Sequence, residues 1–226
     1  MKKVVINIRD LETLLEVDFK DKELLKQAVT HASYANEHDC SDNERLEFLG
    51  DAVIGLLMGE LLFKKGISTE GEMSKKRAQA VCEEALNQYA VTIGLPKFLL
   101  LGKGGELSNG RANPSIIADA FEAVFGAVYL DRGFSETKKL FNRIVIPYLD
   151  QVLDIKDYKS TLQELVQTDR RNIAYHLENQ SGPSHDRVFS VSVRMDDIIL
   201  GLGKGKSKKE AEQNAAKQAL SRLAKE

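Results

Sequence analysis

Residues 41–63 read SDNERLEFLGDAVIGLLMGELLF, and the apolar run that begins at Leu46 leaves almost no polar arc at helical spacing. This pattern predicts a helix that is buried on nearly every side. Glu44, Glu47 and Asp51 nevertheless lie at i, i+3 and i+7, within roughly 60° of one another at about 100° per residue. Ionised carboxylates are costly to remove from water unless a cation accompanies them. The stretch therefore indicates a positive partner beside this helix.

A second apolar run repeats this anomaly. Residues 115–130 read SIIADAFEAVFGAVYL, in which Asp119 and Glu122 are the charged residues, at i and i+3. If the two helices pack together, Glu47, Asp51, Asp119 and Glu122 can converge on one hard divalent cation. Mg²⁺ suits such a site because it takes oxygen ligands and keeps several waters for substrate.

A purely structural explanation of these acids stays open at this point. Each carboxylate can cap a turn, form an ion pair with a distant arginine such as Arg45 or Arg77, or lie at a solvated helix edge. Four acids in two otherwise apolar helices weaken that explanation. Glu44 is a secondary candidate, because Ser41 and Glu44 have the spacing of a capping box at the start of the helix.

Composition and charge set the broad class. The chain has 226 residues, of which 42% are hydrophobic and 29% charged, as expected for one large or two modest soluble domains. Residues 1–155 carry 19 Lys and Arg against 24 Asp and Glu, whereas residues 156–226 carry 13 against 10. The basic balance of the second part is weak evidence for a polyanionic partner, so the positions of its lysines matter more.

Several classes of protein do not fit the sequence. We find no signal peptide and no long uncharged apolar span, so we expect a cytoplasmic protein that does not contact a membrane. The two cysteines, Cys40 and Cys82, form no CxxC, and the four histidines show no zinc spacing. No histidine lies three residues after a glutamate, as a carboxylate-bridged di-iron bundle requires. The glycine-rich segments do not match a phosphate loop, so we expect no nucleotide cofactor.

Periodicity predicts helices in the first part of the chain and a mixed pattern in the second. The expected helices are residues 10–17, 22–32, 41–63, 74–93 and 115–130, and the expected loops are residues 36–43, 66–71 and 102–113. A helix over residues 157–167 precedes three strand-like segments, and a last helix runs over residues 208–224, where Ser207 and Glu210 have capping-box spacing.

The first part resembles the ribonuclease III family. Residues 44–53, ERLEFLGDAV, are similar to the family's signature helix, and residues 117–123, IADAFEA, to its second acidic motif. Smaller matches are Thr30-His31-Ala32-Ser33-Tyr34, Gly71-Glu72-Met73-Ser74 and Asn113-Pro114-Ser115-Ile116. The resemblance implies an all-α endonuclease domain that is homodimeric, uses Mg²⁺ with Mn²⁺ as a substitute, and cuts double-stranded RNA to leave 5′-phosphates and short 3′ overhangs. It assigns Glu47, Asp51, Asp119 and Glu122 as the metal and catalytic residues.

The second part resembles a double-stranded RNA-binding domain with the order α-β-β-β-α. The match rests on Gly182-Pro183-Ser184-His185 between the first two strands and on the basic run 204–209 before the last helix. The resemblance implies contacts of the first helix and the loop with two minor grooves, and contacts of the lysines with phosphates between them. The residues it assigns to RNA binding are Gln163, Gln167, His185, Lys206, Lys208 and Lys209. The lysines also lie at a helix amino terminus, which itself favours an anion.

We therefore expect a two-domain protein: a nuclease domain over residues 1–150, a linker over 151–156 and an RNA-binding domain over 157–226. Carboxylate-held Mg²⁺ activates water toward a phosphodiester, and a two-fold dimer presents one site to each strand. By resemblance, the substrates are precursor ribosomal RNA and structured messenger RNA. The alternative is a regulator that binds double-stranded RNA without cutting it, which is disfavoured because all four acids are present. A helical scaffold with incidental acids is disfavoured by the second domain.

Overall fold

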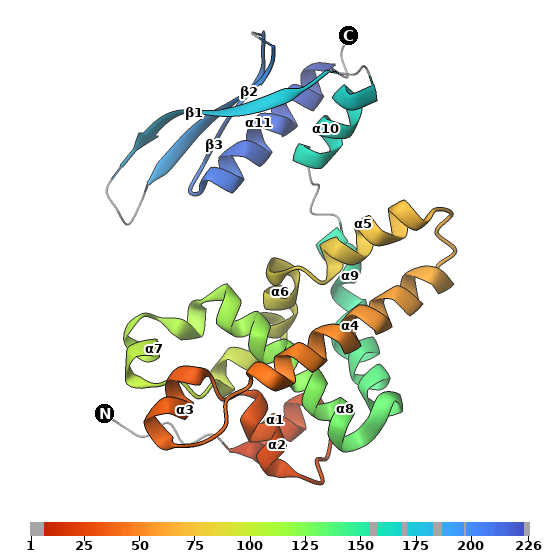
Figure 1. Cartoon of the computed structure of the whole chain (residues 1–226), viewed down its shortest axis with the longest axis vertical. Coiled ribbons are helices and arrows are strands. Elements are labelled where there is room, and N and C mark those ends of the chain that lie inside the picture. The colour runs from red at the N-terminus through yellow and green to blue at the C-terminus, as the bar shows by residue number, and fades with distance from the viewer. Residues whose placement is uncertain (1–6, 154–157, 169–170, 183–186, 197, 224–226) are drawn as a thin grey trace. The chain divides into compact units, whose positions relative to one another are not determined.

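The computed structural model describes residues 7–153, 158–168, 171–182, 187–196 and 198–223. The chain divides into two compact units, residues 1–154 and 155–226 (Figure 1). The first unit is helical, and the second contains a three-stranded antiparallel sheet with helices. This confirms the predicted fold class for both parts of the chain.

The N-terminal unit consists of nine α-helices and two short 3₁₀ turns within the residues described. They are α1 (Ile8–Leu15), α2 (Lys22–Ala28), α3 (Ala32–His38), α4 (Glu44–Lys64), α5 (Glu70–Ala80), α6 (Glu83–Ile93), η1 (Leu95–Phe98), α7 (Lys103–Leu107), η2 (Gly110–Ala112), α8 (Pro114–Ile144) and α9 (Ile146–Leu153). The helix α8 contains one non-helical residue, Gly133, at φ 78°.

The core of this unit forms around α4 and α8, which pack directly against each other (Figure 1). Leu57 and Met58 of α4 are buried in it, as are Phe121 and Phe125 of α8. The ring centroids of these two phenylalanines are 5.1 Å apart. Burial of large apolar side chains along both helices is the main favourable term that holds them together. The packing of α4 against α8 also brings the acidic residues of the two helices into the same region.

Several details of the predicted elements are wrong. The helix expected over residues 22–32 ends at Ala28. Residues 32–38 form α3, although part of this segment was expected as a loop. The predicted helix over residues 74–93 is two helices that are interrupted at Val81 and Cys82, and α5 begins earlier, at Glu70. Residues 102–113 are not a simple loop, because they contain α7 and η2. The second acidic helix, expected to end at residue 130, continues to Ile144.

The start of α4 also differs from the predicted capping box. Its N-cap residue is Asn43, whose side chain donates to the carbonyl oxygen of Ala28 (3.3 Å) and so ties the helix start to α2. The backbone N–H of Glu44 donates to Oδ1 of Asp42 at 3.2 Å. Tertiary packing of Asn43, which is buried, therefore displaces the local motif expected at Ser41.

One side of α4 is open to solvent, contrary to the expectation of a helix buried all round. Phe48, Leu56 and Phe63 are 82%, 60% and 74% exposed. At about 100° per residue these three positions fall within roughly 80° of one another. We call them the α4 apolar stripe. An exposed row of large apolar side chains of this kind is typical of a protein interaction surface.

In the C-terminal unit, helix α10 (Tyr158–Thr168) and helix α11 (Lys208–Leu223) lie on the same side of the sheet (Figure 1). The strands β1 (Ile173–Ser181), β2 (Val188–Met195) and β3 (Ile198–Gly205) pair in the order β1-β2-β3. Val191 and Val193 of β2 are buried against Ala215 and Ala219 of α11 in one apolar core. The predicted α-β-β-β-α order is confirmed.

The predicted linker overlaps a helix, because α9 extends to Leu153. Residues 154–156 of that linker lie outside the described residues. At the start of α11 the predicted capping box is present, since the backbone N–H of Glu210 donates to Oγ of Ser207 at 3.1 Å. This cap fixes the amino end of the helix within the basic run 204–209.

Candidate functional site

Three of the four predicted acidic residues meet where α4 crosses α8. Carboxylate oxygens of Glu47, Asp119 and Glu122 all lie within 4.8 Å of one another. We call these three residues the acidic cluster. Each of them is partly buried, and none forms an ion pair with a lysine or arginine in the parts of the chain that the structure describes. Arg45 and Arg77 therefore do not explain these carboxylates.

Burial is the main cause that raises the pKa of each carboxyl in the acidic cluster, and neighbouring acids add to it. Partial burial, followed by the charges of Asp51, Glu47 and Asp119, raises the pKa of Glu122 to about 8. Burial is also the main cause that raises the pKa of Glu47, with Asp119 and Glu44 adding to it. These carboxylates thus hold a proton at pH values where an exposed carboxyl has lost it. A cation bound at the cluster would offset the unfavourable burial and repulsion of the charged carboxylates.

Asp51 and Glu44 lie at the margin of the cluster. Both are exposed, and neither belongs to the group of oxygens within 4.8 Å. Asp51 acts on Glu122 through its charge, and Glu44 acts on Glu47 in the same way. The structure therefore brings together three of the four predicted acids and keeps Asp51 in electrostatic range of them.

Two residues that we did not predict as site residues act on Asp119. The pKa of Asp119 is raised by its burial and by Glu83 at the start of α6, and His31 opposes that rise. The Nδ1 atom of His31 accepts the backbone N–H of Ser33 at 3.2 Å, which caps α3. His31 belongs to the short Thr-His-Ala-Ser-Tyr match, so the sequence held a signal for it. Glu83 lies in a segment that was expected to be mid-helix and had no such signal.

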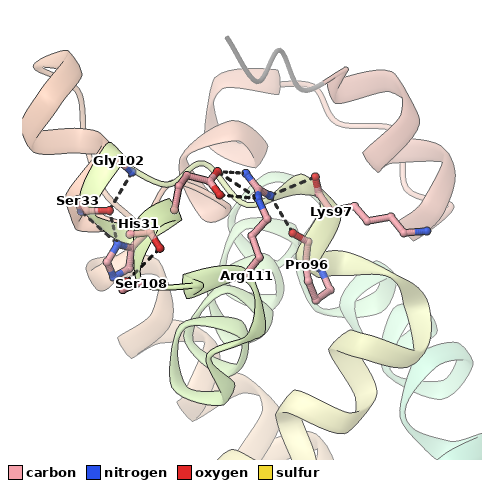
Figure 2. Close-up of polar contacts among 9 residues, drawn as sticks. His31, Ser33, Pro96, Lys97, Gly102, Ser108 and Arg111 are labelled. Carbon is pink, nitrogen blue, oxygen red and sulfur yellow. Dashed lines mark hydrogen bonds and ion pairs between the residues drawn. The ribbon is translucent and has the colours of Figure 1, made fainter. Parts of the chain in front are cut away.

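The segment that leads into α8 is held by a polar network (Figure 2). The guanidinium of Arg111 donates to both carboxylate oxygens of Glu106 and, at 3.0 Å, to the carbonyl oxygen of Pro96. The backbone N–H of Gly102 donates to Oγ of Ser33 at 3.0 Å. Because this network joins α3, η1 and α7, it fixes the start of α8, on which Asp119 and Glu122 lie.

The donor set of the acidic cluster fits a hard divalent cation. Carboxylate oxygens are the ligands that Mg²⁺ and Mn²⁺ prefer, and Mg²⁺ is usually held by few carboxylates together with water. Three partly buried carboxylates with raised pKa values, which form no ion pair with a lysine or arginine among the described residues, are an arrangement that a bound cation stabilises. The cluster can therefore hold such an ion from residues of two helices.

The C-terminal unit presents its predicted lysines to solvent. Lys206, Lys208 and Lys209 are exposed around the amino end of α11, and Gln163 is exposed on α10. The helix dipole at that end favours a phosphate. His185 and the side chain of Gln167 lie outside what the structure describes.

Comparison with known proteins gives matches for both units. The family model described as "Ribonuclease-III-like" matches residues 21–149. The model described as "Double-stranded RNA binding motif" matches residues 158–223. The chain belongs to the ribonuclease III family. It is an endoribonuclease of this family that carries a double-stranded RNA-binding domain.

Full-length relatives support this membership. "Ribonuclease 3" of Onion yellows phytoplasma is 49% identical over 97% of this chain and 92% of its own. "Ribonuclease 3" of Listeria monocytogenes is 44% identical over 95% of this chain and 96% of its own. A solved nuclease domain of ribonuclease III from Campylobacter jejuni matches with a TM-score of 0.58 and 43% identity, and it covers 62% of this chain and 96% of its own. That structure is described as having a region involved in dimer formation.

The solved relative from Campylobacter jejuni is a nuclease domain, and it corresponds to the helical unit of this chain. Among the helices that the structure describes, none has the length and apolarity needed to span a membrane.

Proposed function

We propose that this protein hydrolyses phosphodiester bonds of double-stranded RNA with Mg²⁺, for which Mn²⁺ can substitute, and leaves 5′-phosphates and short 3′ overhangs. The observation that carries this proposal is the convergence of Glu47, Asp119 and Glu122 within 4.8 Å. These residues would hold the ion. When bound, a divalent cation lowers the pKa of water and stabilises charge on the leaving oxygen.

The remaining acids would orient the reactants. Asp51 lies one turn after Glu47 on α4 and is exposed, so its carboxylate can accept a hydrogen bond from the attacking water while Glu122 fixes the same water from α8. No side chain has to form a covalent bond with RNA. Asp51, Glu122, Glu47 and Asp119 are accordingly the residues that we assign to catalysis, and Glu44 remains a secondary candidate.

We assign binding of the duplex to the domain over residues 157–226, and the chemistry to the domain over residues 1–150. Lys206, Lys208 and Lys209 would contact phosphates, and Gln163 on α10 would reach a minor groove. Gln167 and His185 are assigned the same role as Gln163 by resemblance. Precursor ribosomal RNA and structured messenger RNA in the cytoplasm are the proposed substrates.

Cutting both strands requires a second site, and a homodimer supplies it. The α4 apolar stripe supports this assembly, because Phe48, Leu56 and Phe63 are large apolar side chains that are exposed on one side of α4. The dimer-forming region named for the Campylobacter jejuni nuclease domain points the same way. The proposed dimer would cover this stripe with the same stripe of a second copy.

The direct test is incubation of a long RNA duplex, and of one of its strands alone, with the full chain in Mg²⁺ or in chelator. We expect cleavage of the duplex in Mg²⁺, with 5′-phosphate ends, and no cleavage in the other samples. Equal cleavage in chelator would overturn the role of the metal. Binding of the duplex without cleavage in Mg²⁺ would support the non-cleaving regulator instead.

A further inference from the structure

At Gly50 and Gly126 the backbones of α4 and α8 lie too close together to leave room for a Cβ atom. A Cβ atom added to Gly50 would lie 1.8 Å from the carbonyl oxygen of Glu122. A Cβ atom added to Gly126 would lie 2.3 Å from the carbonyl oxygen of Leu46. These neighbours are main-chain atoms, which cannot move aside as a flexible side chain can. Either alanine would therefore force the helices to separate or to rotate.

Both contacts lie beside residues of the acidic cluster. Gly50 lies three residues after Glu47, and the main-chain atoms that it meets belong to Glu122 itself. Gly126 lies one turn after Glu122 and meets the residue that precedes Glu47. A change in helix separation at this crossing thus changes the distance between the carboxylates of α4 and those of α8.

We propose that Gly50 and Gly126 are positioning residues that set the spacing of the acidic cluster and thereby its affinity for a divalent cation. This inference rests on the metal role proposed above. Ligand oxygens must converge within the short coordination distance of the ion, which is about 2.0–2.1 Å for Mg²⁺. The oxygens of the acidic cluster come from two helices, so the gap between the helix backbones decides whether the carboxylates of both helices can reach one ion.

Other glycines provide a matched control. Gly71 in the first turn of α5 has no atom within 4 Å of an added Cβ, so Gly71→Ala changes the same residue type without a close contact. Gly55 and Gly59 of α4 are also open, but they lie on the side of the helix that carries the α4 apolar stripe. A change there would alter the proposed dimer, which makes Gly71 the better choice.

The experiment is a titration of the full chain with Mn²⁺, followed by the electron paramagnetic resonance signal of the free ion. We expect Gly126→Ala to bind Mn²⁺ at least about tenfold more weakly than the unaltered chain, as changes that misplace ligands commonly do. Gly71→Ala should match the unaltered chain. Binding of duplex RNA in chelator should be unchanged in both variants, because the predicted RNA-binding residues lie in the other unit.

Gly126→Ala is preferred to Gly50→Ala because the added atom overlaps its neighbour less. A folded Gly126→Ala variant with unchanged Mn²⁺ affinity would overturn the proposal. Circular dichroism in chelator checks the fold. A variant that does not fold at 25 °C would also overturn it, because the glycine would then serve the whole core and not the spacing of the acids. If the unaltered chain binds no Mn²⁺, the proposed metal role itself fails, which is a distinct result.

Discussion

Carboxylate oxygens of Glu47 and Glu122 lie within 4.8 Å of each other, although the two residues belong to different helices. Two partly buried acids at this distance repel each other, and the charge of Glu47 adds to burial and to the charge of Asp51 in raising the pKa of Glu122. Such a pair is costly in the metal-free protein and useful in a protein that binds a divalent cation. The first two predictions follow from this pair.

Replacement of Glu122 by glutamine keeps the size of the side chain but removes a charged ligand. We expect Glu122→Gln to lower the rate of duplex cleavage by about 10²-fold or more, because stabilisation of developing charge is lost. The affinity for duplex RNA should stay the same. Single-turnover cleavage and filter binding measure the two effects. Glu136→Gln is the control, because Glu136 is a partly exposed residue of the same helix that pairs with Lys139 and does not belong to the acidic cluster. Full activity of Glu122→Gln would remove this residue from the site.

The stability of the metal-free protein should fall as the pH rises. The folded-state pKa of Glu122 is raised to about 8 from 4.5, so the folded state binds more protons than the unfolded state between these values. Stability then decreases with increasing pH across this window. We expect the Tm in chelator to drop by at least about 3 °C between pH 5 and pH 8.

The Glu122→Gln variant should lack most of the fall in Tm between pH 5 and pH 8. Added Mn²⁺ should raise the Tm of the unaltered chain more at pH 8 than at pH 5. Differential scanning calorimetry of the full chain measures both. A Tm in chelator that is the same at pH 5 and pH 8 would contradict the raised pKa.

The basic amino end of α11 should determine the salt dependence of RNA binding. We expect Lys208→Gln to weaken duplex binding and to reduce the slope of log K against log salt by about 0.9, which corresponds to one phosphate contact. Fluorescence anisotropy at several salt concentrations measures the slope. Lys217→Gln is the control, because Lys217 lies further along the same helix, over the ring of Tyr158. An unchanged slope for Lys208→Gln would count against the assignment.

The α4 apolar stripe should hold two copies of the chain together. We expect Leu56→Asp to convert the dimer into a monomer, because the new charge would be buried at the interface. Light scattering after gel filtration reports the mass directly. Val91→Asp places the same charge on an exposed apolar residue of α6 and should leave the mass unchanged. A dimeric Leu56→Asp variant would place the interface elsewhere.

The contacts of Arg111 should stabilise the segment before α8. Its ion pair with Glu106 at 2.6 Å is partly shielded from solvent, and its second contact is a main-chain carbonyl. We expect Arg111→Ala to lower the free energy of unfolding of the nuclease unit by about 1–3 kcal/mol. Urea unfolding of Arg111→Ala, Glu106→Ala and the double variant gives the coupling energy of the pair. Additive effects would show that the two side chains do not act together.

The sequence by itself determined the residue types of the site and the class of each unit. Acids at i, i+3 and i+7 in an apolar run are visible without a structure, because helical periodicity is a local property. The α-β-β-β-α order is visible for the same reason. The capping box of Ser207 was also predicted correctly, since it joins residues that are close in the chain.

Only the tertiary structure decided which acids meet and how closely. Asp51 and Glu47 lie one turn apart in the same helix, yet only Glu47 joins Asp119 and Glu122. The close approach at Gly50 and the effects of Glu83 and His31 on Asp119 involve segments that are distant in the chain. The exposed side of α4 was missed because a buried core helix and a subunit interface have the same apolar composition. Periodicity fixes the faces of a helix, but the partner of each face depends on packing among distant segments.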